Sequence, residues 1–95
     1  MIRRSRLAIG MEILAALSEG PLNSSRLAQR CNINYGRLDE DLKPILALGW
    51  VTKEISGAHD LHKLTDAGLK ALTQYLVLWN EWERGTKLTG GQQAF

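Results

Sequence analysis

The chain of 95 residues contains one cysteine, two prolines and no long hydrophobic run. A single cysteine cannot form a disulfide within the chain, and Cys31 lacks the spacing to the two histidines, His59 and His62, that metal sites usually show. The longest apolar segment, residues 69–82, is interrupted by polar side chains and is shorter than the ~20 residues that span a membrane. We therefore expect no metal site, no membrane association and, since no secretion signal is visible, a cytoplasmic location.

The motifs of common enzyme active sites are also missing. The sequence has no glycine-rich phosphate loop, no His-Glu-x-x-His motif and no cysteine pair. Its serines and histidines show no spacing that indicates a catalytic triad. We therefore expect a protein that is not an enzyme and that needs no cofactor.

Positive charge is modest and is concentrated near the N-terminus. The formal net charge is +2. Residues 1–30 contain five arginines and two glutamates, whereas residues 31–95 contain seven basic and eight acidic side chains. This balance permits nucleic acid as a partner without requiring it.

Apolar side chains recur with a helical period in three segments of the N-terminal half, residues 5–18, 24–30 and 35–48. Asn34 precedes the third segment and is a favourable N-cap. The apolar stripe of this third predicted helix consists of Leu38, Leu42, Ile45 and Leu46. Because proline removes a backbone donor, Pro44 predicts a kink or an early end of this helix.

Beyond Gly49 the apolar period changes from that of a helix to that of a strand. Residues 50–55 alternate and are rich in strand formers, and residues 61–64 can return as the second strand of a hairpin. A fourth helix then begins after Thr65 and is expected to end near Arg84.

Three helices followed by a two-stranded hairpin are typical of a winged helix-turn-helix, a mainly α fold with a small β-hairpin. We expect this domain over residues 1–64. The fourth helix, residues 65–84, is the expected dimerisation helix, and the polar residues 85–95 are the expected flexible tail.

Five short motifs occur in an order and at a spacing that are typical of one family. In chain order they are Ser5-Arg6-Leu7, Glu19-Gly20-Pro21-Leu22, Asn34-Tyr35, Leu48-Gly49-Trp50-Val51 and Leu64-Thr65-Asp66-Ala67-Gly68. Together they resemble the archaeal winged helix-turn-helix transcriptional regulators, a family that includes the ten-kilodalton chromatin proteins of Sulfolobus, over residues 3–80. The resemblance implies binding to double-stranded DNA and, often, dimerisation through the last helix. The sequence departs from the family at His62, where an aromatic residue is usual, and at the acidic run Asp39-Glu40-Asp41.

The third predicted helix carries the candidates for base recognition, because in this fold its N-terminal part enters the major groove. Its candidate DNA contacts are Asn34, Tyr35, Gly36, Arg37, Glu40 and Lys43. The guanidinium of Arg37 matches the O6 and N7 atoms of guanine, and Glu40 can accept from the amine of cytosine or simply face solvent. The alternative is structural: Tyr35 packs on the second helix and Arg37 pairs with Asp41, one helical turn further on.

Contacts to phosphate are expected from three other places: the arginines before the first helix, the start of the second helix and the hairpin. The candidate residues are Arg3, Arg4, Arg6, Ser24, Ser25, Arg26, Lys53, His59 and Lys63.

The fourth predicted helix has more apolar surface than one small domain needs. Its two apolar stripes are Leu69, Leu72, Leu76 and Trp79, and Ala71, Tyr75, Leu78 and Trp82. Since packing on the domain requires a single stripe, the second stripe and the two tryptophans indicate an interface. We expect a homodimer whose contact residues are Leu69, Leu72, Tyr75, Leu76, Leu78, Trp79 and Trp82. The alternative is a monomer in which this helix folds back over the first.

These observations predict sequence-preferring binding of double-stranded DNA by a transcriptional regulator or nucleoid protein. The competing hypothesis is a protein-interaction module that uses the same fold without binding DNA. Whether a small-molecule effector binds is not determined by the sequence.

Overall fold

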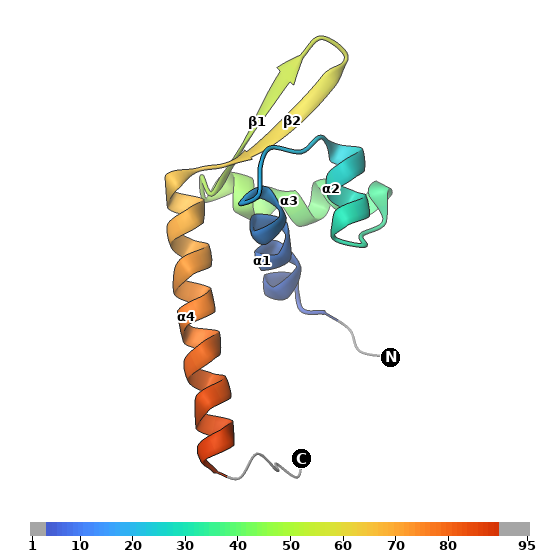
Figure 1. Cartoon of the computed structure of the whole chain (residues 1–95). Helices are drawn as coiled ribbons and strands as arrows, with labels where there is room; N and C mark the ends of the chain where they lie inside the picture. The colour runs from blue at the N-terminus through green and yellow to red at the C-terminus, as the bar shows by residue number, and fades with distance from the viewer. Residues whose placement is uncertain (1–3, 90–95) are drawn as a thin grey trace.

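The computed structural model describes residues 4–89, which form a helical core, a protruding hairpin and one long helix (Figure 1). In chain order the elements are α1 (Arg6–Leu17), α2 (Ser24–Arg30), the 3-10 helix η1 (Tyr35–Arg37), α3 (Leu38–Ala47), β1 (Val51–Ser56), β2 (His59–Leu64) and α4 (Asp66–Leu88). This order confirms the predicted mainly α fold with a small hairpin.

The core forms between the apolar faces of α1, α2 and α3, as their helical periods predict. α1 begins after Ser5, whose hydroxyl accepts a hydrogen bond from the amide of Ala8 at 3.0 Å. α2 begins after Asn23, whose side chain accepts from the amide of Arg26 at 2.8 Å. The largest fully buried side chains of the molecule are Ile13, Leu14, Leu27, Leu38, Leu42, Val51 and His62.

The start of the third predicted helix is a 3-10 turn rather than an α-helix. The side chain of Asn34 caps this turn by accepting from the amide of Gly36 at 2.8 Å, and the α-helix proper begins at Leu38. Pro44 lies inside α3, which continues to Ala47, so the helix does not end early at the proline. Because Pro44 is exposed, the carbonyl that loses its donor can bond to water instead.

The two strands form an antiparallel hairpin, called the wing below, whose register runs from the pair Val51–Leu64 to the pair Ser56–His59. Its connection is a two-residue turn rather than the five-residue one predicted. Gly57 stands at the first turn position with φ 62°, a conformation that favours glycine and suits a tight hairpin. β2 therefore begins at His59, two residues earlier than expected.

The base of the wing is tied to the loop between α1 and α2. Leu22 forms an isolated antiparallel bridge with His62, in which the two residues exchange backbone hydrogen bonds of 3.2 and 2.8 Å. The side chain of His62 is fully buried, and its Nδ1 lies 3.4 Å from the carbonyl oxygen of Leu22. This part of the hairpin thus belongs to the core.

α4 begins where the wing returns to the core. The hydroxyl of Thr65 accepts from the amide of Gly68 at 3.0 Å and donates to the carbonyl of Gly49 at 2.6 Å. The helix reaches Leu88, four residues beyond the expected end, because its helical hydrogen bonds continue through residues 85–88. These four residues therefore do not belong to a tail, and residues 90–95 of the predicted tail lie outside the described part of the chain.

The first turns of α4 pack against α1, and the rest of the helix extends away from the core (Figure 1). At 1.5 Å per residue its 23 residues span about 35 Å. The wing and the free end of α4 point in opposite directions from their junction. None of the helices within residues 4–89 has an apolar stretch long enough to traverse a bilayer.

Candidate nucleic-acid interface

The outer face of η1 and α3 is open to solvent. Leu38 and Leu42 turn inward and are buried, whereas the side chains of Glu40 and Lys43 on the opposite side are 62% and 70% exposed. Nζ of Lys43 pairs with Oε2 of Glu40 at 3.1 Å. An exposed ion pair of this kind contributes only about 0–1 kcal/mol, so both side chains are free to change partner.

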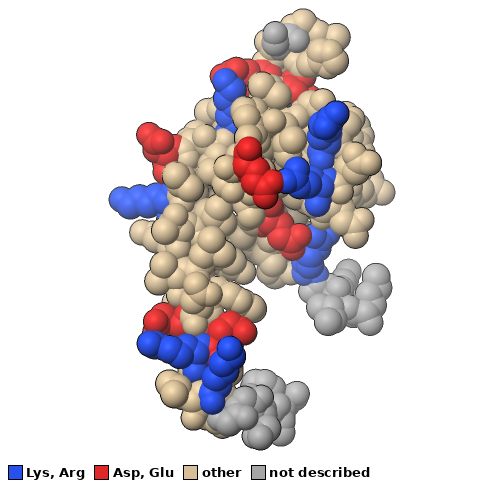
Figure 2. Space-filling view, in the orientation of Figure 1, with Lys and Arg blue, Asp and Glu red and all other residues tan. Residues whose placement is uncertain are grey.

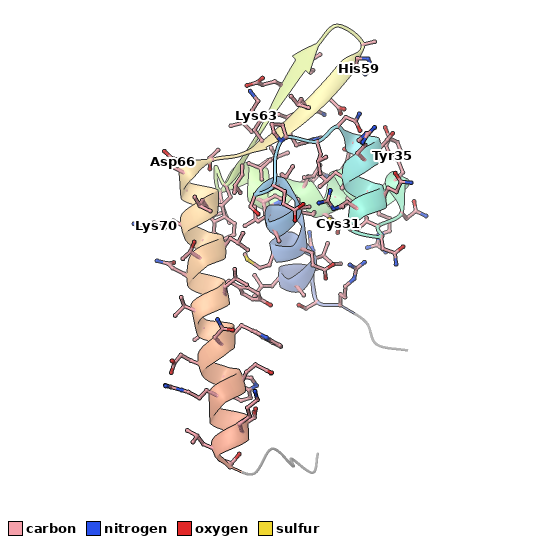
Figure 3. All side chains as sticks on the ribbon, in the orientation of Figure 1. Cys31, Tyr35, His59, Lys63, Asp66 and Lys70 are labelled. Atoms are coloured by element: carbon pink, nitrogen blue, oxygen red, sulfur yellow. The ribbon has the colours of Figure 1, made fainter. Side chains whose placement is uncertain are left out.

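Arg37 does not adopt the structural alternative considered from the sequence, and Tyr35 is largely open to solvent. Tyr35 is 64% exposed and lies at the edge of the molecule beside α2 (Figure 3). Arg37 is exposed, and the ion pairs found within residues 4–89 do not join it to Asp41. Instead it lines a cleft of about 670 Å³ between the start of α1 and the start of α3.

This cleft brings three of the predicted DNA-contacting arginines together. Its lining residues are Arg4, Ser5, Arg6, Ile9, Asn32, Ile33, Asn34, Arg37 and Asp41. The three guanidinium groups outnumber the one carboxylate, so the lining of the cleft is basic. It adjoins the first turn of the predicted recognition helix, and Arg6 and Arg37 can both reach a nucleic-acid backbone from it.

Arg4 is the member of this group with a clear structural role. Its guanidinium pairs with Oε1 of Glu12 at 2.6 Å and donates to the carbonyl oxygens of Cys31 and Asn32 at 2.9 and 3.1 Å. These contacts join α1 to the turn between α2 and η1. Of the three arginines predicted to contact phosphate, Arg4 is thus engaged within the chain, Arg6 is exposed, and Arg3 lies outside the described residues.

The start of α2 differs from the prediction. Ser24 was predicted to meet phosphate, but it is buried, and its hydroxyl donates to Oδ2 of Asp60 at 2.7 Å while its amide donates to Oδ1 at 3.4 Å. The wing carboxylate thus occupies the place expected for a phosphate. The hydrogen bond from the Ser24 hydroxyl lowers the pKa of Asp60 below its ordinary value. Ser25 and Arg26 remain exposed.

The wing carries the remaining predicted phosphate contacts. Lys63 pairs with Glu54 at 3.2 Å, and Lys53 lies 3.8 Å from the carboxylate of Asp60. Figure 3 shows His59 close to the tip of the wing. Ile55 on the facing strand is 76% exposed, although it belongs to the alternating segment predicted as the first strand.

Basic and acidic side chains are interspersed over the surface. In the view of Figure 2, positive groups do not merge into one continuous patch. Arg30, for example, pairs with Glu19 at the end of α1. This face of the protein therefore presents separate cations rather than a strong overall positive field.

The free part of α4 has an apolar groove of about 520 Å³, lined by Tyr75, Leu78, Trp79, Glu81 and Trp82. The side chains of Trp79 and Trp82 are 50% and 64% exposed, and Leu69 and Leu76 are about half exposed. Leu72 differs from these predicted interface residues, because it is only 5% exposed and belongs to the core of its own chain. Tyr75 is half-buried and packs against the same core, whereas Leu69, Leu76, Leu78, Trp79 and Trp82 are left exposed by the described chain.

The described residues offer no site for a metal ion, since no three His, Cys, Asp or Glu side chains within residues 4–89 gather in a suitable group. Cys31 is buried, and its Sγ lies 3.7 Å from the backbone oxygen of Glu12. Burial, together with the nearby negative charge of Glu12, raises the pKa of the Cys31 thiol above 9.0.

Comparison with known proteins identifies the architecture. A family model described as winged helix-turn-helix matches residues 3–81. A comparison with curated proteins finds no match. Among solved structures, the transcriptional regulator BldR from Sulfolobus solfataricus is similar with a TM-score of 0.72 and 22% identity over 83% of this chain. The match covers 60% of BldR, so this chain spans about three fifths of that protein's length.

Two further structures match a larger share of their own length. The DNA-binding protein Sso10a-2 from Sulfolobus solfataricus has a TM-score of 0.67 and 15% identity, with 98% of this chain and 100% of that chain covered. A homodimeric winged helix-turn-helix DNA-binding domain from Mycobacterium bovis has a TM-score of 0.70 and 18% identity, with 84% and 77% covered. At these identities the likeness establishes the fold. Because the family match extends over most of the chain and agrees with the order of α1, α2, α3 and the wing, this chain belongs to the winged helix-turn-helix family.

Proposed function

We propose that this protein binds double-stranded DNA as a homodimer and acts as a transcriptional regulator or a nucleoid protein. The observation that carries the proposal is the open outer face of η1 and α3 beside the protruding wing. In this fold the same helix enters the major groove. The solved structures named above as DNA-binding proteins share this arrangement, which supports the proposal.

Base recognition is assigned to the first part of the third helix. Arg37 is the candidate for guanine, because its planar guanidinium can bind O6 and N7 together, with about 1–3 kcal/mol of discrimination. Once DNA separates the exposed pair of Glu40 and Lys43, Glu40 can accept from a cytosine amine and Lys43 can bind a phosphate. Tyr35 extends from the same end and can donate to a phosphate.

Phosphate contacts are assigned to cations that surround this helix and that the fold leaves accessible. They are Arg6 at the start of α1, Arg26 on α2, and Lys53, His59 and Lys63 on the wing. These side chains position the protein on DNA without reading its sequence, because every phosphate presents the same oxygens. Binding through several such contacts must weaken as salt concentration rises.

Dimerisation is assigned to α4. A second copy of the helix would cover the apolar groove around Trp79 and Trp82, which the protomer leaves exposed. Since α4 and the wing point in opposite directions, a two-fold dimer formed by α4 leaves both wings and both copies of α3 free (Figure 1). Two recognition helices related by a two-fold axis match two half-sites on DNA.

The proposal is tested by fluorescence anisotropy with a labelled random duplex between 50 and 200 mM salt. We expect binding at the lowest salt and a loss of affinity of ~10³-fold or more over this range if six or more phosphates are contacted. Arg26→Ala should weaken binding to all duplexes alike, whereas Arg37→Ala should reduce the difference between preferred and random sequences. Lys70→Ala is the matched control, because Lys70 lies on the side of α4 that faces away from the core (Figure 3).

Two results would contradict the proposal. One is that the wild-type protein does not bind duplex DNA at 50 mM salt. The other is that the protein binds other proteins rather than DNA, with an affinity that does not fall as salt rises. That is the behaviour of a protein-interaction module.

A further inference from the structure

Asp60 makes a contact that links the wing to the helix-turn-helix. It lies on β2, and Ser24 is the first residue of α2, 36 positions earlier in the chain. The carboxylate of Asp60 accepts from both the hydroxyl and the amide of Ser24, at 2.7 and 3.4 Å. Ser24 is only 8% exposed and the side chain of Asp60 is 31% exposed, so the contact lies at the edge of the packed part of the molecule.

This contact is the second of two adjacent attachments between the same segments. Leu22 and His62 form the first through two backbone hydrogen bonds, and Ser24 and Asp60 lie two residues further along each segment toward the tip of the wing. A single attachment at the base leaves a hairpin free to tilt about that point. A second attachment nearer the tip restricts this motion, and only the last part of the wing, residues 56–59, extends beyond it.

Asp60 places a negative charge beside the surface proposed to contact DNA. A carboxylate beside a surface that approaches DNA repels phosphate, so electrostatics alone predict that its removal increases affinity. Glu54 on the same hairpin has the same charge but contacts Lys63 on the exposed side of the sheet rather than α2. The two acids therefore separate the effect of charge from the effect of the contact with Ser24.

We propose that Asp60 is a positioning residue for DNA binding: its contact with Ser24 holds the wing in the direction in which its cations meet the phosphates that flank α3. The inference rests on the proposed DNA-binding function and adds to it a contact that sets the direction of the wing. Lys53 takes part in the same arrangement, because its Nζ lies 3.8 Å from the Asp60 carboxylate and is held near the start of α2. A wing that is fixed before DNA arrives loses less freedom on binding, which increases affinity.

The test compares DNA affinity and its salt dependence for the wild type, Asp60→Ala, Ser24→Ala and the control Glu54→Ala. We expect Asp60→Ala to weaken binding about tenfold although it removes a negative charge, with a reduced salt slope because wing phosphates are no longer contacted. Ser24→Ala removes the hydroxyl without changing charge and should weaken binding in the same direction. Glu54→Ala should leave affinity unchanged or increase it.

Hydrogen exchange of the backbone amides shows whether the variants act as inferred. Amides of β1 and β2 should exchange faster in Asp60→Ala and Ser24→Ala, while those of α1 and α3 keep the wild-type rates. If Asp60→Ala does not fold, the neutral Ser24→Ala variant carries the test.

The outcomes distinguish the inference from the function on which it rests. If the wild type does not bind DNA, the proposed function is wrong. If the wild type binds DNA but Asp60→Ala binds as tightly as Glu54→Ala, or Ser24→Ala binds as tightly as the wild type, the positioning role of Asp60 is wrong and the proposed function stands.

Discussion

Trp82 provides a quantitative test of the dimer interface on α4. Its side chain is 64% exposed in the protomer, beside Trp79 in the apolar groove. Since a tryptophan buries about 150–250 Å² when fully covered, a partner helix would remove roughly 100–160 Å² of Trp82 from water. At ~25 cal/mol per Å² this burial contributes about 3 kcal/mol for each protomer, or about 6 kcal/mol for a two-fold dimer.

Only part of this free energy reaches the binding constant, because association also orders side chains and removes water from polar groups. We therefore expect Trp82→Ala to raise the dissociation constant of the dimer at least ~100-fold, which corresponds to about 2.7 kcal/mol. Sedimentation equilibrium over a range of protein concentrations measures this constant directly. Circular dichroism of the same samples checks that the variant keeps its helices.

Val77→Ala is the matched control for this experiment. Val77 is 58% exposed on α4, but at 100° per residue it lies about 140° around the helix from Trp82. It should leave the dissociation constant unchanged. A Trp82→Ala variant that sediments as the wild type does, or a wild type that is monomeric at tens of micromolar, would refute the reasoning.

Three further predictions concern stability and reactivity. Gly68→Ala should destabilise the fold by about 3 kcal/mol or more in urea unfolding, because the added Cβ would collide with the carbonyl oxygen of Trp50. Gly85→Ala is the control: no atom lies within 4 Å of the added Cβ, so this variant should be neutral or stabilising by up to ~1 kcal/mol. The pKa of Asp60 is lowered in the folded state, so the contribution of its carboxylate to stability is complete above the ordinary pKa of 3.8 and is lost as the pH falls through the folded pKa. The difference in unfolding free energy between the wild type and Asp60→Asn should therefore shrink over that acidic range. A difference that stays constant with pH would contradict the assignment. Burial raises the pKa of the Cys31 thiol, so a thiol-specific reagent at neutral pH should label it in the unfolded but not in the native protein.

The elements of the fold could be predicted from the sequence because their signals are local. The predicted caps Asn34 and Thr65 each act on amides within three residues; Thr65 starts α4 where predicted, whereas Asn34 starts a 3-10 turn that precedes α3. The apolar period of α3 correctly identified the buried Leu38 and Leu42. Turn length was harder to predict, since the turn formers Ser56, Gly57 and Asp60 are spread over five residues and only the pairing of the strands shortens the turn.

The contacts that connect distant segments could not be predicted in this way. Ser24 fits a phosphate contact at a helix start, and nothing near it in the sequence indicates that Asp60 fills that place. Arg4 likewise belongs to a basic N-terminal run, but the fold brings Glu12 and the carbonyl of Cys31 to its guanidinium. Leu72 lies in a stripe with the interface candidates, and only the packing of α4 on α1 shows that it is a core residue. Each of these roles depends on tertiary structure.

The central claim is that the face formed by the start of the third helix and the wing contacts DNA. Titration of the isotope-labelled protein with a short duplex, followed by amide chemical shifts, tests it residue by residue. We expect the changes to concentrate in residues 35–43 and 57–60, with the free end of α4, residues 79–88, unaffected. Changes confined to α4, or an unchanged spectrum at low salt, would contradict the claim.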